Sequence, residues 1–154
     1  MSRRSWIAVL AFFVLPVLAA DIPDLGGVWE LNAGKSTWGK MRKPVSVVLE
    51  INHNQLSLNY SGVVTYADGE SREFGFDGAI DGNYYPMMRS FGSGKCAFHR
   101  ISLTTVESTY HSDDSLYTES SRMVLSRDGR VMTRFMYLKS PEGDRNWIEV
   151  YERR

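Results

Sequence analysis

The residues that most readily suggest catalysis are Ser108, His111 and Asp113, which carry the three side-chain types of a hydrolase triad. Residues three apart on an extended strand leave opposite faces, so Ser108 and His111 are expected to point away from each other. The sequence also lacks the Gly-x-Ser-x-Gly turn that presents a serine nucleophile in many hydrolases. We therefore expect no catalytic residues and a protein that is not an enzyme.

The side chains that bind metals and phosphates are also scattered. His53, His99 and His111 fall in separate strands or turns, with no spacing typical of a metal site. Cys96 and His99 are three apart on a strand, so they too should point to opposite faces. The segment 92–94 is rich in glycine but does not open a helix, so it predicts no phosphate-binding loop. We expect no metal and no cofactor.

Arg134 stands between Met132 and Met136, in a segment whose alternate residues are apolar. A guanidinium on that face needs a partner, because burial of an unpaired charge is costly. Glu119 and Tyr117 fall on the same predicted face, which allows an internal ion pair. Arg134 could instead anchor a ligand carboxylate through two parallel hydrogen bonds. In a different register it would lie in solvent, and all three interpretations remain open.

The N-terminal segment has the pattern of a secretory signal peptide. Arg3 and Arg4 precede an apolar run from Trp6 to Ala20, which ends in small residues. The run is shorter than the roughly 20 apolar residues that a membrane span needs. We expect cleavage after Ala20, export to the periplasm or the medium, and no stable membrane anchor.

Residues 21–154 fit one domain with a sizeable core. The whole chain has 18 basic and 18 acidic residues, and cleavage removes two arginines, so the remaining domain is slightly acidic. The charges form no basic patch, so we expect no nucleic-acid partner. Cys96 is the only cysteine, so no internal disulfide can form. We expect Cys96 to be a buried, inert side chain, with an intermolecular disulfide as the alternative.

Short runs rich in β-branched and aromatic residues alternate with turn residues at regular spacing, which predicts an all-β protein. The expected strands lie near 26–32, 44–52, 55–66, 70–76, 83–90, 95–103, 105–112, 116–126, 130–138 and 146–152. Short connections pair neighbouring strands as hairpins, so we expect a single up-and-down antiparallel β-barrel of about eight to ten strands. The long connection runs from Ala33 to Lys43 and contains Trp38.

Turn positions predict the register of the last three strands. If Asp128-Gly129 is a two-residue loop, Met123 lies opposite Arg134. With residues 141–144 as the next loop, we expect Met136 opposite Ile148 and Arg134 opposite Val150. The face expected inside then carries Met123, Leu125, Met132, Met136, Leu138, Ile148 and Val150. The face expected outside carries an aromatic stripe of Phe135, Tyr137, Trp147 and Tyr151, which the 33–43 connection could also cover.

Gly27 and Trp29 form a Gly-x-Trp motif at the start of the first expected strand, and residues 32–36 follow with an Asn-x-x-Lys-Ser pattern. Arg153 and Arg154 come just after the last expected strand. In these residues the chain resembles the lipocalin-like domains of exported bacterial proteins. The resemblance implies a barrel closed at one end by Trp29, with Arg153 packed over it in a cation–π contact. It also implies that the other end opens into a cavity for a small apolar molecule.

Two functions remain open. The first is binding of a small apolar or amphipathic ligand inside the barrel, for which the candidate residues are Arg134, Met123, Met132, Met136, Phe74, Phe76 and Phe98. Methionine suits irregular apolar pockets, although it also fills ordinary cores. The second is an interaction module with a filled core that forms a homodimer or docks through its outer aromatic stripe. The interface candidates are then Phe135, Tyr137, Trp147 and Tyr151.

Overall fold

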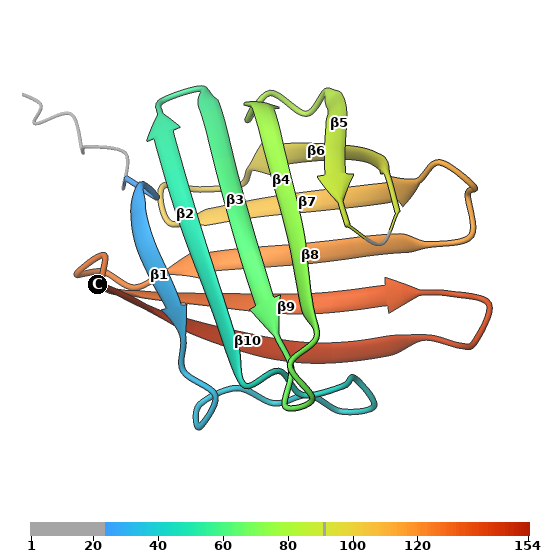
Figure 1. Ribbon diagram of the computed structural model, residues 1–154. Coiled ribbons are helices and arrows are strands. Elements are labelled where there is room, and N and C mark those ends of the chain that lie inside the picture. The colour runs from blue at the N-terminus through green and yellow to red at the C-terminus, as the bar shows by residue number, and fades with distance from the viewer. Residues whose placement is uncertain (1–23, 91) are drawn as a thin grey trace, which may run out of the picture.

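The computed structural model describes residues 24–90 and 92–154 and contains one closed, antiparallel β-barrel (Figure 1). The strands are β1 (Gly27–Leu31), β2 (Ser46–Asn54), β3 (Ser57–Thr65), β4 (Ser71–Ala79), β5 (Tyr84–Arg89), β6 (Gly94–Arg100), β7 (Thr105–Ser112), β8 (Thr118–Leu125), β9 (Val131–Lys139) and β10 (Arg145–Arg153). Each pairs with its neighbours in sequence, and β1 pairs with both β2 and β10. The predicted single up-and-down barrel is confirmed. The expected signal peptide, residues 1–20, lies outside the described residues.

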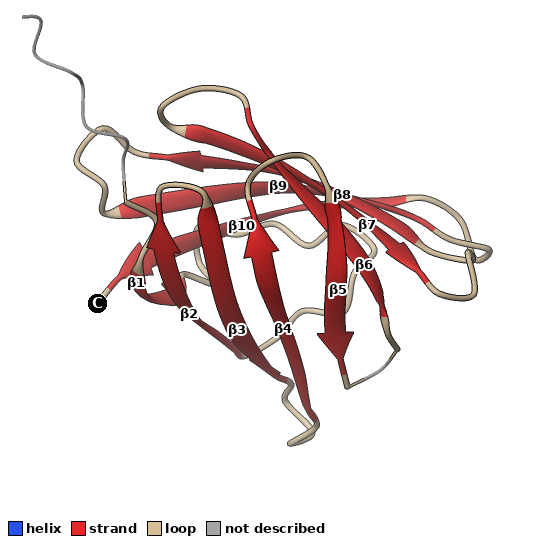
Figure 2. Cartoon of the chain, turned by 90° about the horizontal axis from the view of Figure 1, so that it is seen from above, coloured by secondary structure: helices blue, strands red, loops and turns tan. Residues whose placement is uncertain are grey.

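The barrel is flattened into two walls that cross each other at a wide angle. In the view from above, β1 to β5 run across β6 to β10 (Figure 2). Within the ranges 24–90 and 92–154 there is no helix that could span a membrane.

Tight turns set the register of the hairpin between β8 and β9. Gly129 has a positive φ of 69°, which glycine adopts at little steric cost, and its amide donates to the carbonyl of Ser126. Met123 then pairs with Arg134, and Leu125 pairs with Met132. The register predicted from Asp128-Gly129 is confirmed here.

The register predicted for β9 and β10 is wrong by one residue. Met136 pairs with Trp147 rather than Ile148, and Arg134 pairs with Glu149 rather than Val150. A loop of residues 141–144 would in fact place Met136 opposite Glu149, so the expected pairing did not follow from that loop. The connection between the last paired residues, Leu138 and Arg145, is two residues longer, and a difference of two keeps Trp147 on the same face.

A shift of one residue exchanges the faces of a whole strand. Trp147 is only 7% exposed and Tyr151 only 1%, and both lie inside with Glu149. Ile148 and Val150, expected inside, lie on the outer face and are half-buried. The predicted outer aromatic stripe is therefore wrong for Trp147 and Tyr151, whereas Phe135 and Tyr137 are 46% and 43% exposed.

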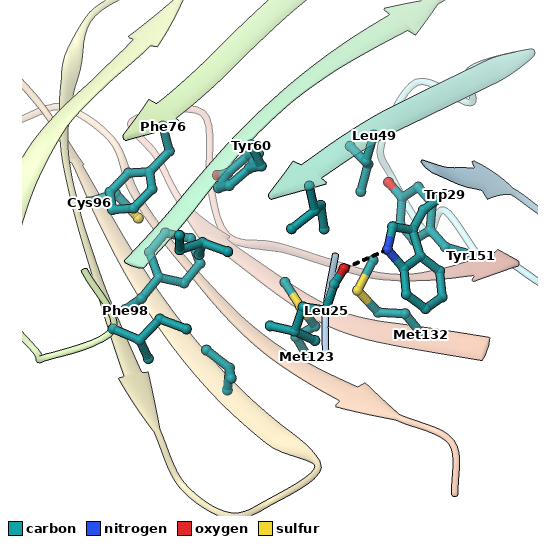
Figure 3. Packing of buried hydrophobic residues seen from close by; sticks show 14 of the residues in the cluster. Leu25, Trp29, Leu49, Tyr60, Phe76, Cys96, Phe98, Met123, Met132 and Tyr151 are labelled. Carbon is teal, nitrogen blue, oxygen red and sulfur yellow. Dashed lines mark hydrogen bonds between the residues drawn. The ribbon is translucent and has the colours of Figure 1, made fainter. Parts of the chain in front are cut away.

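Trp29 closes one end of the barrel. Its side chain is fully buried, and its indole Nε1 donates a hydrogen bond of 2.9 Å to the carbonyl of Leu25 (Figure 3). The guanidinium carbon of Arg153 lies 4.6 Å from the centre of the Trp29 ring, so the expected cation–π contact is present. Arg153 also donates to the backbone carbonyls of Gly26 and Asp24, which fastens the N-terminal end of β1 to the C-terminal end of β10.

Trp29 belongs to a cluster of buried hydrophobic side chains inside the barrel. Phe76 and Phe98 pack with ring centres 4.6 Å apart, and Tyr60 stacks on Phe76 at 5.8 Å (Figure 3). Met123 and Met132 are buried in the same cluster. This half of the barrel is an ordinary packed core.

We expect Arg153→Ala to lower the free energy of unfolding by about 2 kcal/mol, because it removes the cation–π contact and two hydrogen bonds to backbone carbonyls. Urea unfolding of residues 21–154 measures the change. The matched control is Arg154→Ala, since Arg154 pairs with Glu30 on the exposed surface and should contribute little. Equal effects of the two variants would contradict the closing role of Arg153.

Candidate functional site

The end of the barrel opposite Trp29 contains a cavity of about 640 Å³. Its walls come from β2, β3, β4, β5, β7, β8, β9 and β10, and from the connection between β1 and β2. Cavities of 300–1,000 Å³ are the usual size for binding a small organic molecule. The cavity is the candidate site.

A buried ion pair lies in the wall of this cavity. Arg134 on β9 donates from Nη1 to Glu149 on β10 at 3.1 Å, and both side chains are about nine-tenths buried. Burial works to lower the pKa of Arg134, but the Glu149 carboxylate raises it, so the guanidinium stays charged. The structure thus places Arg134 inside with a protein partner.

The Glu149 carboxylate has a full set of donors. Trp147 Nε1 donates to Oε1 at 2.8 Å, and the Tyr151 hydroxyl donates to Oε2 at 2.9 Å, beside the bond from Arg134. A buried carboxylate is tolerated when its oxygens are hydrogen-bonded in this way. The sequence prediction missed this partner because it placed Glu149 on the outer face.

A second ion pair lies in the same cavity wall. Arg89 on β5 donates to Glu119 on β8 at 3.0 Å, and the guanidinium carbon of Arg89 lies 3.7 Å from the centre of the Tyr110 ring. Glu119, considered as a partner for Arg134, therefore pairs with Arg89 instead. Tyr117 lies nearer the mouth, where its hydroxyl donates to Glu142.

Three hydrogen-bond donors in the cavity wall have weak partners or none. Arg134 Nε and Trp38 Nε1 are buried without a hydrogen-bond partner among the described residues. The hydroxyl of Tyr60 donates only to the thioether of Met87, at 4.0 Å. Burial raises the pKa of Tyr60, so the phenol keeps its proton. Among the buried side-chain atoms of the described residues in the cavity wall, those without a partner are therefore donors and not acceptors.

The connection between β1 and β2 lies across the mouth and is fastened on both sides. Thr37 exchanges backbone hydrogen bonds of 2.9 and 2.8 Å with Ile148. Arg42 pairs with Asp68 and Glu70 in the turn between β3 and β4, and stacks on Tyr66 at 3.9 Å. Trp38 and Met41 lie between these two attachments and line the cavity.

The predicted site residues divide between the cavity and the closed core. Phe74, Arg134 and Met136 line the cavity. Four other candidates belong to the buried cluster that contains Trp29 and do not line the cavity: Phe76, Phe98, Met123 and Met132. Two of the interface candidates, Trp147 and Tyr151, also line the cavity, and Phe135 and Tyr137 lie on the outer surface.

Sequence reasoning missed several lining residues. Tyr110 follows the inward alternation of its strand, so period-two patterning could have placed it inside. The partners of Arg89 carried no such signal, because β5 pairs with β4 and β6 and the Arg89 side chain meets Tyr110 and Glu119 inside the barrel.

The suspected triad is not assembled. The Ser108 hydroxyl bonds that of Ser121 at 2.7 Å, whereas His111 bonds Tyr84 and Thr118. Asp113 accepts from Ser93. Within residues 24–90 and 92–154, no three histidine, cysteine or acidic side chains are grouped to hold a metal ion.

No family model matches the sequence, and no curated protein does. The resemblance carried by Gly27, Trp29 and Arg153 thus remains an expectation, and the functional argument depends on the cavity itself.

Removal of the Glu149 charge tests the buried ion pair between Arg134 and Glu149. Glu149→Gln should lower the free energy of unfolding by about 3 kcal/mol, because the Arg134 charge is left buried and unpaired. The double variant Arg134→Met with Glu149→Gln should be more stable than Glu149→Gln alone. Urea unfolding measures both, with Glu152→Gln on the same strand as the exposed control. If the double variant were the less stable, the pairing would be wrong.

Cys96 is 2% exposed, as predicted for a buried thiol, and burial raises its pKa to about 12. At pH 8 only about one thiol in 10⁴ is then ionised, because each unit of pKa changes the thiolate fraction tenfold. We expect an aromatic disulfide reagent to label native protein at least 100-fold more slowly than protein unfolded in urea. Rapid stoichiometric labelling of the native protein would contradict this burial.

Proposed function

We propose that this chain is a non-catalytic binding protein that holds one small apolar or amphipathic molecule in its barrel. The observation that carries the proposal is the cavity of about 640 Å³ at one end of a barrel whose other end is densely packed. A closed antiparallel sheet has no free edge for strand pairing, so its interior is the natural place for a ligand.

The lining supports binding through burial of apolar surface. Phe74, Met87, Met136 and Leu138 provide apolar surface, with Trp38 at the mouth. Each square ångström of apolar surface removed from water contributes roughly 25 cal/mol, so a ligand of moderate size gains several kcal/mol before entropic costs. Methionine side chains adapt to different ligand shapes, which favours a ligand class over a single compound.

The alternative of an interaction module with an outer aromatic stripe loses its main support. It needs four exposed aromatic residues and a filled core. Trp147 and Tyr151 line the cavity instead, and only Phe135 and Tyr137 of the four lie on the surface. No other contact of the described residues favours this function.

We also propose that the protein acts outside the cytoplasm. The support is the sequence pattern of Arg3, Arg4 and the apolar run that ends at Ala20. The absence of a cysteine pair is compatible with this placement, since a barrel of this size can be stable through its core alone.

The neutral fluorophore N-phenyl-1-naphthylamine tests the binding function. We expect one molecule to bind per chain, with fluorescence enhanced by transfer into the apolar cavity. Met136→Trp places a larger side chain in the cavity and should weaken binding at least tenfold. Leu138→Trp, nearer the mouth, tests the same point if Met136→Trp folds poorly.

The matched control is Met88→Trp, which adds the same side chain on the outer face, where Met88 is 76% exposed. It should leave the dissociation constant unchanged. A fluorophore that fails to bind, or that binds all three variants equally, would overturn the proposed function.

A further inference from the structure

We infer that the molecule bound in the cavity is electrically neutral and presents an oxygen acceptor, as a ketone, ester or amide does. The inference rests on the proposed binding function and names the chemical class of the ligand. Two independent features of the cavity carry it, its charge balance and its excess of donors.

Two arginines buried in the cavity wall are each paired with a glutamate that is also largely buried. Arg134 pairs with Glu149 at 3.1 Å, and Arg89 pairs with Glu119 at 3.0 Å. A ligand carboxylate that approached either arginine would also approach the glutamate beside it, and a ligand ammonium would meet the arginine. In a site of low polarity such like-charge contacts are poorly screened. An ion would therefore lose its hydration without gaining a new counter-charge.

A ligand carboxylate cannot replace the Glu149 carboxylate as the partner of Arg134 without a large cost. That carboxylate holds Arg134, Trp147 and Tyr151 through three hydrogen bonds, so its displacement would break all of them. Arg134 is thus a structural partner that can still contribute its Nε–H, rather than a free cation awaiting an anion.

The donors that remain call for an acceptor. Trp38 Nε1 and Arg134 Nε are buried with no partner among the described residues, and the Tyr60 hydroxyl has only a distant thioether. Burial of an unsatisfied donor is unfavourable, so an oxygen acceptor from the ligand would relieve that cost. The glutamate oxygens, in contrast, are engaged within the ion pairs. A ligand that only donates hydrogen bonds would therefore find no comparable site.

A series of rigid naphthalene compounds tests both features with the full mature chain. Naphthalene has no oxygen, 2-acetylnaphthalene adds a neutral carbonyl, and 2-naphthoate is an anion at pH 8. Competition with N-phenyl-1-naphthylamine measures the three affinities. We expect 2-acetylnaphthalene to bind at least tenfold more tightly than 2-naphthoate and at least threefold more tightly than naphthalene.

Two variants identify the donors. Tyr60→Phe removes only an O–H, whereas Trp38→Phe removes an N–H together with part of the apolar ring, so the loss of naphthalene binding measures the apolar part. Combined, they should weaken binding of 2-acetylnaphthalene about five- to tenfold more than binding of naphthalene. Tyr137→Phe, on the outer surface, is the control and should change neither affinity.

The outcomes separate this inference from the proposed function. Binding of 2-naphthoate as tight as that of the ketone would overturn the neutral class. Equal affinities of ketone and naphthalene, or equal losses for both compounds in the double variant, would overturn the acceptor. If neither naphthalene nor the fluorophore bound, the binding function itself would be wrong.

Discussion

Closure of the barrel through β1 is the constraint on which the rest of the structure depends. This short strand must pair with β2 on one side and β10 on the other. Trp29 takes part in both pairings, opposite Leu49 on β2 and Arg153 on β10. Its indole is fully buried, held by Leu25 and covered by Arg153. Without this closure the sheet would expose two unpaired edges, and the interior would open to solvent along its length.

Closure at Trp29 also divides the interior into two regions with different roles. The buried cluster that contains Trp29 supplies the burial that stabilises a small barrel. The end beneath the β1–β2 connection leaves the cavity. Tyr60, Met87 and Tyr151 belong to the cluster and also line the cavity, so the packed core forms the floor of the site.

Polar chemistry inside the cavity is dominated by pairs formed within the protein. Two arginines and two glutamates neutralise each other across strands, and Arg89 further stacks on Tyr110. Each of these buried pairs is neutral as a whole, so neither leaves an uncompensated buried charge for a ligand to balance. What remains for recognition is apolar surface and a few N–H and O–H donors, which is why we infer a neutral, acceptor-bearing ligand.

The sequence by itself determined the strands, the barrel topology and the inward faces of most strands. Alternation of apolar and polar residues sets the inward face of a strand, and short turns pair each strand with the next one in sequence. Asp128-Gly129 is one such turn, and the β8–β9 register followed from it. The β9–β10 register was wrong by one residue, which exchanged the two faces of β10. Only the tertiary structure shows that Glu149 accepts hydrogen bonds from Arg134, Trp147 and Tyr151, because sequence alternation gives a face but not the partners within it. It alone also decided that Arg89 meets Glu119, because β5 and β8 are not paired and their side chains meet only across the interior of the barrel.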